Sequence, residues 1–248
     1  MLSDAFIPKR RFRQPLFVNP LLRFCSSSIG RKWIVALTGL VLFGFVIGHL
    51  IGNLQFFLGS SEPINRYGAF LQGLGELLWV VRFGLLAMLV LHIVFTIKLR
   101  AENRAARPAG YAVTNRRASS PAARWMLLSG LMVLCFIIYH LLHFTVQVPA
   151  VNMVGQNFVG LHDAQGRHDV YRMMILGFSN PLASAFYVVG VALLSLHLNH
   201  GIMSMGQTLG LNTGKVRPLW EKGGPTLAWL IFLGYASMPV AVLAGIVK

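Results

Sequence analysis

The chain has 248 residues, of which 55% are hydrophobic and 12% are charged. A soluble domain carries about 25% charged residues, so this composition indicates an integral membrane protein and excludes an ordinary soluble domain. The formal net charge is +15. A basic balance on a membrane protein usually reflects Lys and Arg on its cytoplasmic side, so it predicts no nucleic-acid partner.

In chain order, a basic segment over 1–32 precedes five apolar stretches, each long enough to cross a bilayer core of about 30 Å. A short interfacial helix is expected around 64–74, and an irregular polar segment over 149–172. We therefore predict a single all-α domain, an integral membrane bundle of five transmembrane helices. The spans are expected at about 33–58, 77–99, 125–148, 177–203 and 225–247.

The distribution of basic residues predicts the orientation of this bundle. In an arrangement of five spans, almost all Lys and Arg fall on the side of the N-terminus, which we call the inner side. The exceptions are Arg66, Arg82, Arg167, Arg172 and Lys248. Cytoplasmic loops carry an excess of Lys and Arg, so the N-terminus is expected in the cytoplasm and the C-terminus outside. The basic inner face is also suited to contact with anionic membrane lipid or with a soluble partner.

The first span combines a histidine with a face of glycines. His49 lies within an uncharged stretch, where an imidazole is costly unless it faces the bundle interior and has a partner. Gly44, Gly48 and Gly52 recur every four residues beside it. This spacing predicts close approach of a flat ligand or, as the ordinary alternative, of another helix.

Histidines occur in four of the five spans, at His49, His92, His140 and His197. At a rise of about 1.5 Å per residue, His49 and His140 lie about 22–24 Å from the inner helix ends, whereas His92 and His197 lie about 10–12 Å from them. The four therefore form two pairs at two depths. Two facing imidazoles can hold a haem iron from both sides, which predicts electron transfer because no open iron position remains.

Two further histidines leave the pairing ambiguous. His143 follows His140 by three residues and His200 follows His197 by three, so each lies near the same helix face as its neighbour. The estimated depth differs by only a few ångströms between His140 and His143 and between His197 and His200. Either member of each couple can therefore be the ligand. His162 and His168 fall in the polar segment and are expected to be solvated. Cys25 and Cys135 provide no C-x-x-C-H motif, so any haem would be held without thioether links.

Four stretches together resemble the single-chain, five-helix, di-haem cytochrome b anchor of succinate dehydrogenase and fumarate reductase. They are SSSIGRKWIVALTGLVLFGFVIGHLIGNLQFFLG, LHIVFTIKLR, GLMVLCFIIYHLLHFTV and SLHLNHG. The resemblance implies two haem b groups, one held by His49 and His140 and the other by His92 and His197. It favours His140 because Gly130 precedes it by ten residues, and His197 because Gly201 follows in a His-x-x-x-Gly pattern.

The resemblance also implies the role of the chain in an enzyme complex. The chain would anchor a flavoprotein subunit and an iron–sulfur subunit to the bacterial inner membrane, as a multi-pass protein, and pass electrons between them and a membrane quinone. The quinone would be menaquinone or ubiquinone. Succinate chemistry would belong to the partner subunits, and assembly of the complex into a higher oligomer is compatible with this role.

Several charged residues are candidates for contacts with haem propionates or quinone. Arg31, Lys32 and Arg124 lie at the inner ends of spans, and Arg82 lies just inside the outer end of the second span. Interfacial anchoring or snorkelling of these side chains is the alternative. Glu62 and Glu76 are candidates for an outer quinone site, or ordinary interfacial carboxylates.

Two other functions are compatible with intramembrane histidines. A cytochrome b of another quinone-linked dehydrogenase or of a hydrogenase would use the same haem ligation with a different soluble partner. A transporter with a histidine proton relay is the third hypothesis, but such relays often include carboxylates. All seven acidic residues of this chain lie outside the central parts of the spans.

Overall fold

The computed structural model describes residues 19–106 and 121–248. The described part is all-α, with 79% helix and no strands. Its helices are α1 (Pro20–Ser26), α2 (Ser28–Leu54), α3 (Glu62–Gly73), α4 (Glu76–Ala105), α5 (Pro121–His140), α6 (Val170–Ser179), α7 (Pro181–Thr208) and α8 (Arg217–Leu243). Short 3₁₀ turns at Gln55–Phe57 and Gly214–Val216 and a π-helical turn at Leu141–Thr145 complete them.

Five of these helical stretches are long and apolar enough to cross a membrane, which confirms the five expected spans as helices. They are Ser28–Phe57, Glu76–Ala105, Trp125–Thr145, Pro181–Thr208 and Gly214–Leu243. Most continue past the expected boundaries into charged sequence at the inner end, because hydropathy marks only the apolar part of a helix. The expected interfacial helix is also present, as α3.

Two helices differ at their ends from the expected spans. The fourth span was expected from residue 177, but the helix begins at Pro181, because the Asn180 side chain accepts hydrogen bonds from the backbone of Leu182 and Ala183 and Pro181 takes the first helical position. The preceding apolar residues form the separate helix α6. The fifth span was expected over 225–247, but α8 runs over Arg217–Leu243 with Pro225 inside it.

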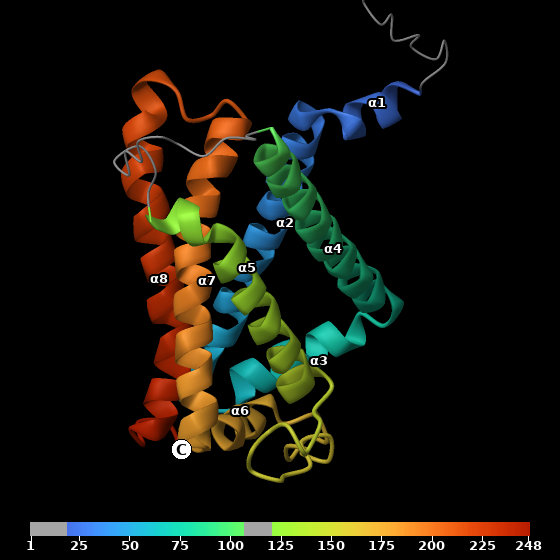
Figure 1. The fold of residues 1–248 in the computed structure, drawn as a ribbon. Helices are drawn as coiled ribbons and strands as arrows, with labels where there is room; N and C mark the ends of the chain where they lie inside the picture. Colours follow the sequence, from blue (N-terminus) through green and yellow to red (C-terminus); the bar gives the residue numbers. More distant parts are fainter. Residues whose placement is uncertain (1–18, 107–120) are drawn as a thin grey trace, which may run out of the picture.

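The long helices are not packed equally tightly. Helix α7 packs on α5, α8 and α2, and the core lies among these elements around Leu50, Phe136, Tyr187 and Ile231. Helix α4 contains no buried residue and packs chiefly on α2. In Figure 1, α4 is tilted away from α7.

The two ends of the bundle differ in character. At the inner end, drawn at the top of Figure 1, α2 begins and α4 ends, and Arg31 forms an ion pair with Glu102 there. At the outer end, α3, α6 and the irregular segment 149–169 lie together. We call this group of α3, α6 and residues 149–169 the outer cap.

A polar network holds the outer cap together. The fully buried Asn65 of α3 donates to Asp163 and Asp169, and its carbonyl oxygen accepts from the backbone of Tyr171 in α6. Arg167 donates through both terminal nitrogens to Glu62 and through Nε to Asp163, at 2.8 Å. The segment expected to be irregular is therefore ordered by its own polar contacts, without regular secondary structure.

Candidate functional site

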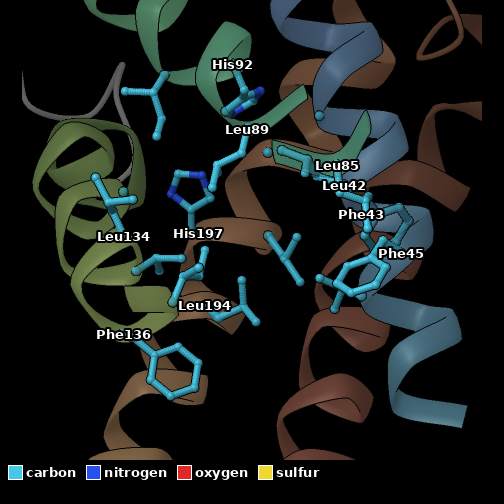
Figure 2. Close-up of a pocket in the computed structure, with 18 of the residues that line it drawn as sticks. Leu42, Phe43, Phe45, Leu85, Leu89, His92, Leu134, Phe136, Leu194 and His197 are labelled. Carbon is cyan, nitrogen blue, oxygen red and sulfur yellow. The ribbon is translucent and has the colours of Figure 1, made fainter. Parts of the chain in front are cut away.

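An apolar cavity of about 1330 Å³ lies between α2, α4, α5 and α7. This volume exceeds the range of about 300–1,000 Å³ typical of sites for a single drug-sized ligand. Leucine and phenylalanine side chains form much of its wall, among them Leu42, Leu89, Leu134 and Phe136 (Figure 2). His49, His92, His140, His197 and His200 all line it.

His92 of α4 and His197 of α7 lie on facing sides of the cavity (Figure 2). The Nδ1 atom of His92 lies 3.2 Å from the Val35 carbonyl oxygen and 3.2 Å from the Thr38 hydroxyl. A carbonyl only accepts, so this Nδ1 carries the proton. The Thr38 hydroxyl donates its own hydrogen to the carbonyl of Ile34, and it therefore accepts from His92 as well.

The ring of His197 is held in the same way. Its Nδ1 lies 3.4 Å from the hydroxyl of Ser129, and that hydroxyl donates its hydrogen to the Met126 carbonyl. A neutral imidazole has one donor and one acceptor nitrogen. Both His92 and His197 are therefore held with the proton on Nδ1 and the lone pair on Nε2, which is the tautomer that binds a metal through Nε2.

Two glycines bring the neighbouring helices close to these rings. A Cβ atom on Gly39 would lie 3.2 Å from His92 Cε1, and a Cβ on Gly130 would lie 3.3 Å from His197 Cε1. Gly39 directly follows Thr38, and Gly130 directly follows Ser129. Helices α2 and α5 thus each present a hydroxyl residue and a glycine to an inner histidine.

The same two helices carry the outer histidines ten residues after these glycines, at His49 and His140. Ten residues of helix correspond to about 15 Å along the bundle. The imidazole rings of His49 and His140 lie next to each other, nearly perpendicular, with their centroids 5.9 Å apart. The structure therefore brings the four histidines together in two pairs at two levels of one cavity.

The two outer histidines, His49 and His140, have different kinds of hydrogen-bond partner. His140 Nδ1 lies 3.3 Å from the Tyr187 hydroxyl. The amide of Asn53 donates to both Nε2 and the carbonyl oxygen of His49, at 3.2 and 2.7 Å. Ligation of a metal by His49 Nε2 would replace the first of these hydrogen bonds.

The two alternative histidines differ in position. His143 is fully buried outside the cavity wall, with its ring stacked on Phe144 at a centroid distance of 4.0 Å. His200 lines the cavity beside His197. Of the two loop histidines, His162 is exposed as expected, but His168 is half-buried and bonded to Gln147.

The predicted cationic contacts are divided between the two ends of the cavity. Lys32 lines the inner part, together with Thr96, whose buried hydroxyl has no hydrogen-bond partner in the described part of the chain. Arg82 lines the outer part, with its guanidinium 4.9 Å from the centroid of the Trp79 ring.

Arg31 is bound to Glu102 and to the Cys25 carbonyl, away from the cavity. Arg124 lies within α5, but its side chain is outside the described residues.

The glycine face expected around His49 does not line the cavity. Cβ atoms on Gly44 and Gly48 would meet no atom within 4 Å, and neither residue belongs to the cavity wall. Only Gly52 is used for close packing, because its Cβ would clash with the Tyr67 ring of α3. The structure does not test a flat ligand on this face, and Gly39 and Gly130 are the glycines that lie against the cavity histidines His92 and His197.

Sequence reasoning missed Thr38, Ser129 and Tyr187. The first two had a readable signal, since the pattern of a hydroxyl residue, a glycine and a histidine ten residues later occurs in both α2 and α5. Tyr187 had none, because its partners come from a helix far away in sequence.

No cluster of three or more potential metal-ligating His, Cys, Asp or Glu residues occurs in the described ranges. Comparison of the chain with protein-family models, with curated proteins and with solved structures gave no match. The functional argument therefore depends on the cavity and on the chain's own residues.

Proposed function

We propose that the chain is a di-haem cytochrome b membrane anchor of a succinate:quinone oxidoreductase. The observation that carries the proposal is the pair of histidines at each of two levels in one apolar cavity, with the inner two held as Nδ1–H tautomers. A haem held by two histidines needs only two protein ligands per iron, one on each side. Bound haem supplies one-electron redox chemistry at its iron.

The residues of the chain fit such a group in three respects. His92 and His197 present Nε2 lone pairs from two different helices, and Thr38 and Ser129 fix both rings by accepting from Nδ1–H. Gly39 and Gly130 remove the side chains that would displace these rings. Most of the remaining wall is apolar, as the surroundings of a haem ring require.

The two ends of the cavity suit the carboxylates of haem. Lys32 supplies a cation at the inner end, and Thr96 supplies a hydroxyl that no other described residue binds. Arg82 supplies a cation at the outer end. Charged groups at these positions are close to the membrane surfaces, where their desolvation cost is lowest. This role favours Lys32 and Arg82, whereas Arg31 is already neutralised by Glu102.

Insertion in a bacterial inner membrane with the N-terminus in the cytoplasm is part of the proposal. The five long helices expose large apolar side chains outside the cavity, such as Leu37, Val80, Leu128, Val189 and Leu233. Such surfaces are stable in lipid and unfavourable in water. The concentration of Lys and Arg at the inner end supports the orientation.

The partners follow from the sequence resemblance. The chain would bind a flavoprotein and an iron–sulfur subunit at its basic inner end and exchange electrons with a membrane quinone. Glu62 is a weaker quinone candidate than its sequence position indicates, because its carboxylate is bound by Arg167. A cytochrome b of another quinone-linked dehydrogenase would have the same cavity and differ in its soluble subunits.

The first test is a reduced-minus-oxidised spectrum with pyridine haemochrome quantification on the detergent-purified complex. Two b-type haems per chain are expected, together with flavin and iron–sulfur subunits that co-purify. A chain without haem would contradict the proposal and favour the transporter. If the chain contains haem but co-purifies with other subunits, it would be the cytochrome b of a different enzyme complex and not of a succinate:quinone oxidoreductase.

Single histidine variants then test the pairing. His92→Ala and His197→Ala should each lose the same haem, whereas His49→Ala and His140→Ala should each lose the other one. His162→Ala, in the exposed loop, is the matched control and should retain both. If the His49 and His92 variants lost the same haem, the assignment of these two histidines to different depths in the cavity would be wrong.

A further inference from the structure

A buried tyrosine joins two histidines beside the outer pair. Tyr187 of α7 is only 6% exposed, and its ring packs against Phe136, Phe144 and Phe178 at centroid distances of 5.0–5.5 Å. In such apolar surroundings a phenolic hydroxyl needs a hydrogen-bond partner. Its oxygen lies 3.3 Å from His140 Nδ1 and 3.1 Å from His143 Nδ1.

His143 forms the closed end of this network. Its side chain is fully buried, and its Nε2 has no partner in the described part of the chain. Gly177 of α6 covers that side of the ring, since a Cβ there would lie 3.1 Å from His143 Nε2. Within residues 19–106 and 121–248, His143 therefore contacts a polar group only through Nδ1, which meets Tyr187.

The number of protons limits how the three groups can be arranged. Tyr187 has one hydrogen to donate and can accept others. If both histidines donated to Tyr187, its own hydroxyl hydrogen and the His143 Nε2 lone pair would both be buried without a partner. The favoured arrangements are therefore chains in which Tyr187 accepts from one histidine and donates to the other.

The proposed function selects between these two chains. His140 binds a metal through Nε2 only if its proton is on Nδ1, so His140 must donate to Tyr187, and Tyr187 must donate to His143. We infer that Tyr187 is the positioning residue of the outer haem ligand His140, and that His143 is the acceptor that fixes the direction of the Tyr187 hydroxyl. This inference rests on the proposed function, and it gives His143 a role other than iron ligation.

The consequence concerns the reduction potential of the outer haem. A hydrogen bond accepted from Nδ1–H makes a ligating imidazole more basic, which stabilises the oxidised iron. Removal of the acceptor should therefore raise the midpoint potential of the outer haem and leave that of the inner haem unchanged. The ring of His140 should also reorient.

The test is a redox titration and a low-temperature EPR spectrum of the purified Tyr187→Phe complex. His140→Ala identifies the outer haem by its loss. Tyr187→Phe should retain both haems, while the ratio of reduced to oxidised outer haem at a fixed potential rises by up to about tenfold, which is about 59 mV for a one-electron couple. The g values of the outer haem should shift as well.

Tyr139→Phe is the matched control, because Tyr139 packs against the same His143 and Tyr187 rings but donates its hydroxyl to the Val151 carbonyl. It should leave both haems unchanged. His143→Phe should keep two haems and shift the outer potential less than Tyr187→Phe does.

An outer haem in Tyr187→Phe that matches the Tyr139→Phe control, or loss of a haem from His143→Phe, would overturn the inference while the proposed function stands. A wild-type complex without haem would overturn both.

Discussion

A histidine in an apolar helix binds a metal only if one ring nitrogen is free of its proton, and a second hydrogen-bonding group decides which one. For His92 and His197 that group is a hydroxyl on the neighbouring helix, which has already donated its own hydrogen to a helix carbonyl. His92 has the Val35 carbonyl as a second acceptor. The two inner histidines therefore differ in how far each depends on its hydroxyl.

This difference predicts unequal effects of removing the hydroxyls. Ser129→Ala should weaken retention of the inner haem several-fold, since it removes the described acceptor of His197 Nδ1–H, a hydrogen bond of about 0.5–1.5 kcal/mol. Thr38→Val, which preserves shape, should have a smaller effect because Val35 still accepts from His92. Haem content after detergent washing measures both. Equal losses in the two variants would contradict the unequal dependence.

For single residues, the sequence predicts the depth of each histidine along its helix. It does not predict which ring nitrogen of the histidine carries the proton. The depth of each histidine along its helix follows from a constant rise per residue, and the neighbouring rings of His49 and His140 agree with it. The hydrogen bond between His140 and Tyr187 joins two helices, so no local pattern contains it.

At the scale of elements, close approach between helices is concentrated at glycines that face a ring. Gly39 and Gly130 lie against His92 and His197, whereas Gly44 and Gly48, on the same α2 as Gly39, face open space. The regular spacing of Gly44, Gly48 and Gly52 predicts a small-residue face correctly but does not say what the face meets. Helix rotation within the bundle decides that, and it depends on packing with helices that a single-helix pattern does not describe.

Alanine substitutions should separate these two kinds of glycine. Gly39→Ala and Gly130→Ala place a Cβ 3.2–3.3 Å from a histidine carbon, so they should shift the ring and lower the content of the inner haem. Gly44→Ala and Gly48→Ala should keep both haems and stabilise α2 by about 0.5–1 kcal/mol, because alanine is the better helix former. Haem quantification and thermal unfolding of the four variants test this, and equal haem loss in all four would contradict it.

At the scale of the whole molecule, the outer cap joins the two helix pairs that form the cavity. Helix α3 connects α2 to α4, and α6 lies between α5 and α7 along the chain. Asn65 and Glu62 bind residues of the segment 149–169 and of α6, and so they connect the two pairs across the outer end. Sequence reasoning expected Glu62 to be a quinone contact or an ordinary loop or interfacial carboxylate. Its partner Arg167 lies about a hundred residues away, and no local pattern identifies such a pair.

Acidification should loosen the outer cap in two stages, because three of its groups have lowered pKa values. Burial lowers the pKa of His168 below its ordinary value of 6.5, and its Nε2 must be unprotonated to accept from Gln147. The hydrogen bond from Arg167 lowers the pKa of Glu62. Burial opposes ionisation of Asp163, but hydrogen bonds from Arg167 outweigh it and lower that pKa as well.

A lowered pKa in the folded state means that the contribution to stability is complete above the ordinary pKa and is lost as the pH falls through the folded value. His168 should therefore begin to destabilise the cap below about pH 6.5, Glu62 below about pH 4.5 and Asp163 below about pH 3.8. Cleavage of the segment 149–169 by an acid-tolerant protease, measured from pH 8 to pH 3, should accelerate over these two ranges. His168→Gln should remove the first stage and Arg167→Gln should weaken the second, because each variant abolishes the interaction whose loss on protonation drives that stage. A rate that is independent of pH in the wild-type chain would show that these contacts do not hold the cap closed.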